Sequence, residues 1–472
     1  MSFVRFAIVL ATICIAAAPA AAATLSVRPV YRPGETADLI VNGLRPGERI
    51  RIHSWRRFSR SERDPATGQW SMRLRVMHGW ADFRADRRGT VAVERARPLA
   101  GTYPMADGLG LFWSMRLADD PVVRDAATAA ATPAETALEE RRVDFRAQRG
   151  NGETLAAALA FAPMRPGTFL ARVQRPGLVG VFAAPPGARA LPTLIFMHGS
   201  EGADVGRARE AALGFAEQGF TTLALLYHRR PWQQATEGVA DFHTNTPVEM
   251  LQQARDWLAT RPEADADRIG LIGNSKGAEF AMVGAATYDW VRAAVGCVPS
   301  DVVWEGDTAH APAGQASSWS RADTPLPYVP LHPWVDADGD FRPDNFFDNT
   351  ERYVRSRRDR PREAAAARIP VERSRARLLL LGGDRDEVWA SGAMSRAIVT
   401  TMRRAGRGGQ AEALTFPRAG HQICGDGTFP VHAYEIQSTR PRDKILTDEG
   451  HANAIAFRRK IAFLHEALAP RR

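Results

Sequence analysis

The stretch that decides the fold is Gly270-Leu271-Ile272-Gly273-Asn274-Ser275-Lys276-Gly277-Ala278-Glu279-Phe280. It begins in a short apolar run and continues from Ala278 in small, helix-forming residues. Gly273 to Gly277 are therefore expected on a turn between a buried strand and a helix. This is the G-x-S-x-G pattern of a nucleophile elbow, in which two glycines let strand and helix approach closely beside one exposed serine. The pattern makes Ser275 a candidate nucleophile.

Apolar strands and helices alternate on both sides of this stretch, from residue 143 onward. Strands are expected at 193–197, 221–226, 268–272, 291–298, 377–381 and 412–416, and helices at 208–218, 248–259, 278–286, 391–404 and 452–468. Continuous apolar strands joined by helices predict a mostly parallel sheet with helices on both faces. We therefore predict an α/β-hydrolase domain at 143–472, with a lid-like insertion at about 304–365.

The first part of the chain has a different pattern. Short strand-like runs such as Arg49-Ile50-Arg51-Ile52 alternate with turn signals over 24–117, and helical periodicity is essentially missing there. Even spacing of this kind predicts an all-β domain, an immunoglobulin-like sandwich. Residues 118–142 are rich in Ala, Thr, Asp and Pro and are expected to link the two domains.

The N-terminus has the features of a secretory signal peptide. Arg5 precedes the apolar run Phe6 to Ala18, and the small residues up to Ala23 provide a cleavage site. We interpret 1–23 as a signal peptide and expect a periplasmic or secreted protein, with an uncleaved N-terminal anchor as the alternative. No later segment is long enough for a stable membrane span.

Composition and motifs argue against several partners. The net charge is +9, but the arginines are scattered and carry no nucleic-acid motif, so we expect no nucleic-acid binding. The acidic run Asp336 to Asp340 fails the calcium-loop pattern, because Phe341 and Phe347 stand where Gly and Glu are required. Zinc-ligand spacing and phosphate-binding loops are also missing. We expect a small-molecule substrate and neither a metal nor a cofactor.

Two further loops supply the partners that a nucleophilic serine needs. In this fold an acid and then a histidine follow the serine along the chain. The apolar run 377–381 leads into a loop that carries Asp384 and Asp386, and His421 follows the strand expected at 412–416. We predict a catalytic triad of Ser275, Asp386 and His421, with Asp384 as the alternative acid.

The segment Met197-His198-Gly199-Ser200-Glu201-Gly202 follows another apolar strand and matches an H-G-x-x-G oxyanion loop. Backbone N–H groups at this place stabilise the negative charge that develops on the substrate oxygen. We expect the N–H of Ser200, or that of Gly199, to act together with the N–H of Lys276. His198 would then position the loop and not act as a base.

Two cysteines remain if cleavage follows Ala23, namely Cys297 and Cys424. Cys297 ends an apolar run after the helix that follows the elbow, and Cys424 lies three residues after His421. Disulfides persist in exported proteins, so we hypothesise that these two cysteines are bonded.

With these residues in place, the sequence resembles the acyl-CoA thioester hydrolase and bile acid-CoA:amino acid N-acyltransferase family over nearly the whole mature chain. The resemblance is carried by the elbow, by Asp386-Glu387-Val388-Trp389, by Ala419-Gly420-His421, and in the N-terminal part by Trp80 to Asp86 and Gly110 to Met115. It implies attack on an acyl thioester to form an acyl-enzyme. Transferase members often have a cysteine nucleophile, so Ser275 favours hydrolysis by water.

The leading hypothesis is therefore a serine hydrolase of acyl thioesters. One feature disagrees with the family's substrate: acyl-CoA is cytoplasmic, whereas residues 1–23 predict export. An exported carboxylesterase or amidase of the same fold is one alternative. A non-enzymatic protein that binds envelope components is another.

Overall fold

The computed structural model describes residues 22–63, 67, 70–118, 141–307, 316–333, 349–433 and 443–470. Several predictions therefore lie outside the described residues: nearly all of the signal peptide 1–23, nearly all of the linker 118–142, the acidic run 336–340 and parts of the insertion 304–365. Among the helices described, none combines the length and the apolar composition that a membrane crossing requires.

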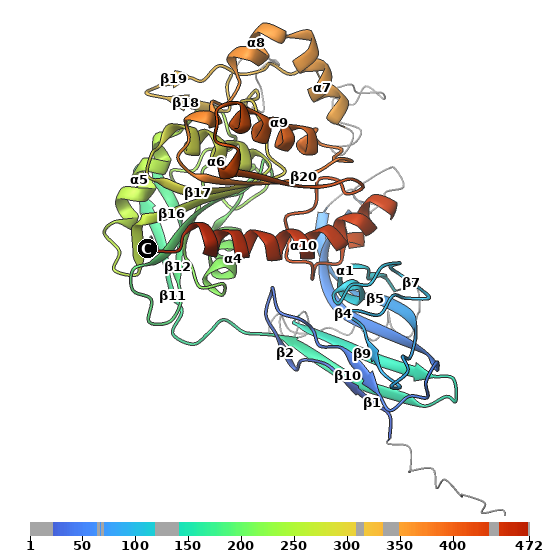
Figure 1. Ribbon diagram of the computed structural model, residues 1–472. Helices are drawn as coiled ribbons and strands as arrows, with labels where there is room; N and C mark the ends of the chain where they lie inside the picture. Colours follow the sequence, from blue (N-terminus) through green and yellow to red (C-terminus); the bar gives the residue numbers. More distant parts are fainter. Residues whose placement is uncertain are drawn as a thin grey trace, which may run out of the picture.

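The larger domain is built on an eight-stranded sheet with the order β11-β12-β14-β13-β16-β17-β20-β21 (Figure 1). Its strands are β11 (Phe169–Arg175), β12 (Leu178–Ala184), β13 (Leu191–Met197), β14 (Thr221–Leu225), β16 (Ala264–Asn274), β17 (Val291–Cys297), β20 (Arg377–Gly383) and β21 (Ala411–Phe416). β12 pairs antiparallel with both of its neighbours, and every pair from β14 to β21 is parallel. The mostly parallel α/β-hydrolase sheet predicted from the sequence is confirmed.

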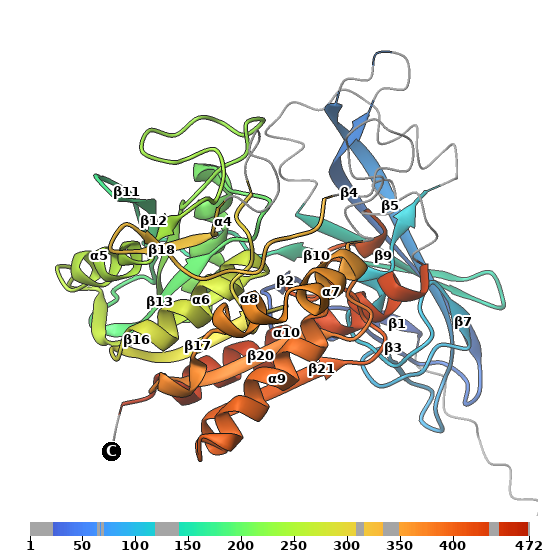
Figure 2. The same cartoon turned by 90° about the horizontal axis from the view of Figure 1, so that it is seen from above.

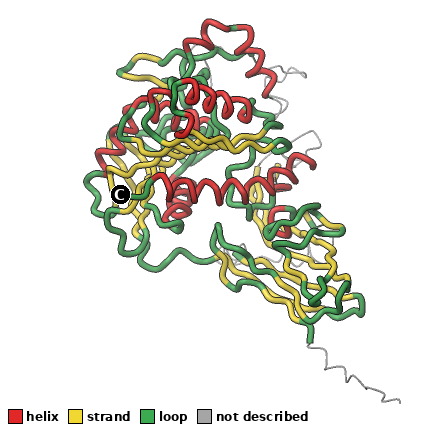
Figure 3. The backbone as a smooth tube through the Cα atoms, viewed as in Figure 1, coloured by secondary structure: helices red, strands yellow, loops and turns green. Residues whose placement is uncertain are grey.

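Helices cover both faces of this sheet, as Figure 3 shows. They are α4 (Val205–Ala216), α5 (Glu249–Leu258), α6 (Lys276–Thr287), α9 (Ser391–Arg404) and α10 (Asp443–Ala467). Leu378 and Leu380 of β20 share a core with α5, α6 and α9, whereas Leu379 and Leu381 share a core with α10. Because successive side chains of a strand point to opposite faces, the unbroken apolar run of β20 is what burial on both faces requires.

The N-terminal part contains two further sheets. A three-stranded sheet has the order β1-β3-β6, and a larger sheet has the order β2-β10-β9-β4-β5-β7 with β8 attached to β5. Their strands are β1 (Thr24–Ser26), β2 (Val30–Tyr31), β3 (Ile40–Asn42), β4 (Arg49–Arg63), β5 (Trp70–Arg84), β6 (Val91–Ala92), β7 (Ala100–Gly101), β8 (Arg116–Leu117), β9 (Arg142–Arg149) and β10 (Thr154–Phe161).

One predicted domain boundary was wrong. The hydrolase domain was expected to begin at residue 143, but β9 pairs along β4 and β10 pairs with β9 and β2. Val143, Phe145 and Leu159 of these strands are buried in the N-terminal core. The N-terminal domain therefore extends to Phe161, and the sheet of the hydrolase domain begins at β11.

Helix α10 joins the two domains. It begins at Asp443, well before the predicted start at residue 452, and Figures 1 and 2 show it reaching from the catalytic sheet to the N-terminal strands. Leu446 lies in the N-terminal core together with Trp113. His451 Nδ1 lies 2.8 Å from Asp107 Oδ2, and the same oxygen accepts a hydrogen bond from Trp113 Nε1 at 3.0 Å. The C-terminal half of α10 packs under the large sheet.

The insertion packs on the α9 side of the large sheet. It includes the strands β18 (Trp319–Arg321) and β19 (Thr324–Pro325), which join β15 (Thr246–Pro247) in a small sheet, and the helices α7 (Thr350–Asp359) and α8 (Pro361–Ala366). Figure 1 shows α7 and α8 above α9. Trp304, which precedes these elements, is buried in a core with Trp389 and Met394. The insertion is therefore packed against the loop that carries Asp386.

The contact between α10 and the N-terminal domain can be tested at Gly450. A Cβ atom there would lie 2.3 Å from Cε3 of Trp113, so Gly450→Ala must separate the helix from the tryptophan. We expect a loss of about 1–3 kcal/mol of stability, measured by urea unfolding. Gly214→Ala in α4 is the matched control, because nothing lies within 4 Å of its Cβ and alanine favours a helix. Equal effects of the two substitutions would contradict the close contact.

Candidate active site

The turn between β16 and α6 holds Ser275 in a strained conformation. Ser275 has φ 53° and ψ −117°, a backbone conformation that residues other than glycine rarely adopt. A Cβ on Gly273 would lie 2.0 Å from Gly277 O, and one on Gly277 would lie 2.3 Å from the carbonyl oxygens of Met197 and His198. Only glycine fits at either position, and this close approach brings the serine beside the end of β13.

The structure brings Ser275, His421 and Asp386 together. His421 Nε2 lies 3.1 Å from Ser275 Oγ, and His421 Nδ1 lies 2.9 Å from both carboxylate oxygens of Asp386. The three residues are only 5–8 % exposed. The serine comes from the elbow, the acid from the loop after β20 and the histidine from the loop after β21, as the order of strands in the sheet requires.

Asp386 is held in place by groups of its own loop. Its Oδ1 accepts hydrogen bonds from the backbone N–H groups of Val388 and Trp389, at 2.9 and 3.1 Å, and its Oδ2 accepts one from the hydroxyl of Ser391. The alternative acid, Asp384, instead binds Arg396 at 2.8 Å on the surface. The structure therefore places Asp386, and not Asp384, against the histidine. The role of Ser391 has no signal in the sequence.

The surroundings of His421 favour its charged form. Burial alone would lower the pKa of the imidazole, but the carboxylate of Asp386, followed by those of Glu449 and Glu387, raises it above its ordinary value. An imidazolium formed at this position is thus stabilised by negative charge on the side away from Ser275. This is the electrostatic arrangement that a general base next to a serine needs.

Several backbone groups of the loop after β13 are already bonded. Gly199 N–H donates to Glu201 Oε1 at 3.1 Å, and Ser200 O accepts from Arg230 Nε at 2.7 Å. His198 O accepts from the Tyr227 hydroxyl at 2.7 Å. The N–H of Gly199 is therefore occupied, which favours Ser200 as the donor to a substrate oxygen.

The second expected donor lies at the start of α6. The first N–H groups of a helix have no acceptor within the helix, and α6 begins at Lys276. With Ser275 N–H bonded to Cys297 O at 2.9 Å, the elbow backbone is fixed in the orientation that presents the N–H of Lys276. Ser200 and Lys276 together are the candidate oxyanion donors.

Cys297 and Cys424 form a disulfide with a Cα–Cα distance of 5.9 Å. Cys297 ends β17, next to the elbow strand, and its carbonyl holds the Ser275 N–H. Cys424 lies three residues after His421. The bond thus links the strand beside the nucleophile to the loop of the histidine.

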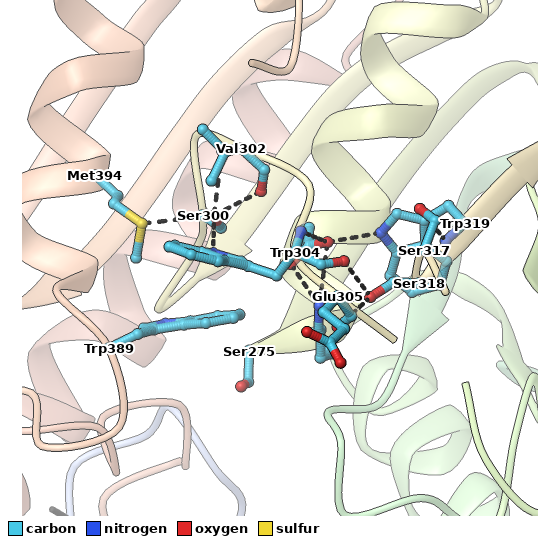
Figure 4. A network of polar contacts seen from close by, with 12 residues as sticks. Ser275, Ser300, Val302, Trp304, Glu305, Ser317, Ser318, Trp319, Trp389 and Met394 are labelled. Atoms are coloured by element: carbon cyan, nitrogen blue, oxygen red, sulfur yellow. Dashed lines mark hydrogen bonds and ion pairs between the residues drawn. The ribbon is translucent and has the colours of Figure 1, made fainter. Parts of the chain in front are cut away.

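A buried ion pair lies behind the elbow and was not foreseen from the sequence. Lys276 Nζ lies 3.0 Å from Glu279 Oε2 and 2.7 Å from the Ser318 hydroxyl. Glu279 Oε1 also accepts hydrogen bonds from Trp304 N–H and from Trp319 Nε1. Figure 4 shows this part of the insertion next to Ser275. The only signal in the sequence was a Lys and a Glu three residues apart in an otherwise apolar helix.

This pair attaches the insertion to the nucleophile helix. Lys276 is 3 % and Glu279 0 % exposed. Burial lowers the pKa of the Lys276 ammonium and raises that of the Glu279 carboxyl, and the opposite charge of the partner counteracts both shifts. Each charge is tolerated because the other is present.

Glu279→Gln tests that dependence. It keeps an oxygen for the two tryptophans but leaves the Lys276 ammonium without a counter-charge, so we expect a loss of about 3 kcal/mol in thermal or urea unfolding. Adding Lys276→Met removes the unpaired charge and should recover part of the loss, while the backbone N–H at position 276 remains. A double variant no more stable than Glu279→Gln would contradict the explanation.

Two sequence models of one protein family match this chain. The sequence model for the acyl-CoA thioester hydrolase/BAAT N-terminal region matches residues 34–141, and the model for the BAAT/acyl-CoA thioester hydrolase C terminus matches residues 246–470. The mouse mitochondrial acyl-coenzyme A thioesterase 2 is 26% identical over 404 residues, covering 85% of this chain and 79% of that protein. Human acyl-coenzyme A thioesterase 1 is 25% identical over 407 residues, covering 85% and 86%.

Solved structures are matched more distantly. A thermophilic carboxylesterase from a metagenomic library aligns at 16% identity with a TM-score of 0.38, covering 65% of this chain and 91% of that one. A dienelactone hydrolase-like phosphotriesterase from metagenomic libraries aligns at 15% identity with the same TM-score of 0.38, covering 64% and 99%. The two family models together match most of the sequence, and the chain belongs to the acyl-CoA thioester hydrolase and BAAT family.

Proposed function

We propose that this protein hydrolyses acyl thioesters through an acyl-enzyme on Ser275. The observation that carries the proposal is the hydrogen-bonded series Ser275 Oγ, His421 and Asp386 at the end of β16, with distances of 3.1 and 2.9 Å. The family relationship supports the thioester as substrate, because the curated relatives are described as acyl-coenzyme A thioesterases.

In the first half-reaction, His421 Nε2 takes the proton of Ser275 as Oγ attacks the acyl carbon. Asp386 stabilises the imidazolium through Nδ1. The carbonyl oxygen becomes an oxyanion, which the backbone N–H groups of Ser200 and Lys276 would bind; one such donor commonly contributes about 3–4 kcal/mol to the transition state. The carbon–sulfur bond then breaks, and the departing thiolate takes the proton from His421.

In the second half-reaction, His421 removes a proton from water, and the hydroxide oxygen attacks the acyl carbon of the ester on Ser275. The same two N–H groups bind the second oxyanion. The carbon–oxygen bond to Ser275 breaks, the serine recovers its proton from His421, and the carboxylic acid leaves. No group beyond those of the chain and water is required by this sequence of steps.

The second candidate is a carboxylesterase or amidase that uses the same residues. Its support is the N-terminal segment: if 1–23 is a signal peptide, as we propose, the mature protein acts in the periplasm or outside the cell, where oxygen esters are available. The Cys297–Cys424 disulfide is consistent with an oxidising compartment.

The N-terminal domain is proposed to be an immunoglobulin-like sandwich. The support is that residues of its two sheets, such as Val41 of β3 and Phe83 of β5, share a single core. Its contacts with α10 join it to the hydrolase domain.

A fluorophosphonate probe tests the nucleophile. The probe should label the wild-type protein covalently and should not label Ser275→Ala, because only an activated serine attacks the phosphorus. Ser374→Ala is a suitable control, since Ser374 is another buried serine, far along the chain from the elbow. Equal labelling of wild type and Ser275→Ala would refute Ser275 as nucleophile.

A matched pair of substrates tests the thioester preference. Palmitoyl-CoA and p-nitrophenyl palmitate share the acyl chain but differ in the leaving group. We expect at least about tenfold higher kcat/KM for the thioester, or about 1.4 kcal/mol in transition-state free energy. A clear preference for the oxygen ester would favour the carboxylesterase.

A further inference from the structure

The loop that carries His421 is bonded to one face of α10. Gln422 N–H donates to Glu449 Oε1 at 2.9 Å. One turn later, Asn453 Nδ2 donates to Gln422 O at 2.7 Å, and Asn453 Oδ1 accepts from Gly425 N–H at 2.5 Å. Glu449 is 0 % and Asn453 6 % exposed. The residue that follows the histidine is thus held at both its N–H and its C=O by this helix.

The same turn of α10 is fixed from the other side by the N-terminal domain. His451 binds Asp107, whose other oxygen accepts a hydrogen bond from the backbone N–H of Leu109 at 2.8 Å. Gly450 lies directly against Trp113. Glu449 therefore stands on a helix turn whose position is set by the N-terminal domain, while its carboxylate reaches the histidine loop.

The charge of Glu449 also acts on the histidine. Among the described residues, the carboxylates that act on His421 include Asp386 and Glu387 from the loop after β20, Glu201 from the loop after β13, and Glu449 from α10. Asp386 has the strongest influence among these carboxylates, and Glu449 follows it in raising the pKa of the imidazole. Because both groups are buried, solvent screens the interaction between them only weakly.

We propose that Glu449 is a positioning residue for His421: its carboxylate fixes the histidine loop through the Gln422 N–H and supplies a second negative charge near the imidazole. The inference rests on the proposed function of His421 as the base for Ser275. It gives the N-terminal domain a defined part in catalysis, because Asp107 and Trp113 hold the helix turn on which Glu449 stands.

Three variants distinguish the effect of the hydrogen bond between Glu449 and Gln422 from the effect of the negative charge of Glu449. Glu449→Gln keeps an oxygen for the Gln422 N–H but removes the charge. Glu449→Asp keeps the charge but shortens the side chain, so that the hydrogen bond is lost. Glu466→Gln is the control, because it removes a half-exposed carboxylate of α10 that pairs with Arg377 and Arg459 and not with the histidine loop.

The measurement is the rate at which a fluorophosphonate labels Ser275 between pH 4 and 9. Labelling requires the neutral form of His421, and it can be measured without knowing the natural substrate. Removing a negative charge destabilises the imidazolium, so the pKa of His421 falls. The acid limb of the pH profile, where the labelling rate decreases as His421 becomes protonated, therefore moves to lower pH. We expect a shift of about half a pH unit in Glu449→Gln, with a plateau within about twofold of the wild type. Glu466→Gln should match the wild type.

Glu449→Asp should keep the acid limb of the wild type and lose about tenfold of the plateau rate, because the loop is no longer held. Should Glu449→Gln fail to fold, the plateau rate of Glu449→Asp still tests the proposal. Asp107→Asn should lower the plateau about threefold without moving the acid limb, since it weakens the contact with His451.

An acid limb in Glu449→Gln that coincides with the wild type, or an unchanged plateau in Glu449→Asp, would overturn the proposal. An unchanged plateau in Asp107→Asn would remove the N-terminal domain from it. Failure of the proposed function looks different: the wild-type protein itself would not be labelled at Ser275.

Discussion

The active site depends on the close approach of β16, α6 and the end of β13 at Gly273 and Gly277. No side chain fits at these two positions, and Ser275 between them is held at φ 53°. A non-glycine residue in this region costs on the order of 1–3 kcal/mol, which the surrounding packing must supply. The result is a serine at the carboxyl end of the central strand β16, 3.1 Å from His421 Nε2 and close to the two candidate oxyanion donors.

Two sets of buried polar contacts support this strained turn from opposite sides. The Lys276–Glu279 pair joins the nucleophile helix to Trp304 and Trp319 of the insertion. On the other side, α10 and the Cys297–Cys424 disulfide hold the loop of His421. These contacts restrict the motion of the nucleophile helix and of the histidine loop. A catalytic site needs such restriction, because misplacing a catalytic group by about 1 Å can lower the rate about 10²-fold.

The sequence was sufficient to predict those features that depend on neighbouring residues along the chain. Residues 378–381 of β20 and 269–272 of β16 are short apolar runs, and such runs predict parallel strands buried on both faces. The elbow, the acid loop and the histidine loop then follow from their places after these strands. Between Asp384 and Asp386 the spacing could not decide, because which carboxylate reaches the histidine depends on the loop hydrogen bonds to Val388, Trp389 and Ser391.

The contacts between the domains and those of the insertion had no clear signal in the sequence. β10, with the sequence TLAAALAF, is a weak alternating pattern that does not reveal which sheet it joins, so the domain boundary was placed too early. The start of α10 was predicted too late because Glu449, His451 and Asn453 in its N-terminal half are polar residues that bond to the histidine loop and to Asp107. In the sequence, the spacing of Lys276 and Glu279 is typical of an exposed ion pair on a helix. Only the structure shows that the insertion covers this pair.

The central claim is that Ser275 carries the acyl group during turnover. Its most direct test is acid quenching of the wild-type protein during hydrolysis of an acyl thioester, followed by mass measurement of the peptide that contains Ser275. The account predicts that this peptide gains the mass of the acyl group, attached to the serine oxygen. Acylation of a different residue, or steady turnover with no acylated peptide at any time, would contradict it.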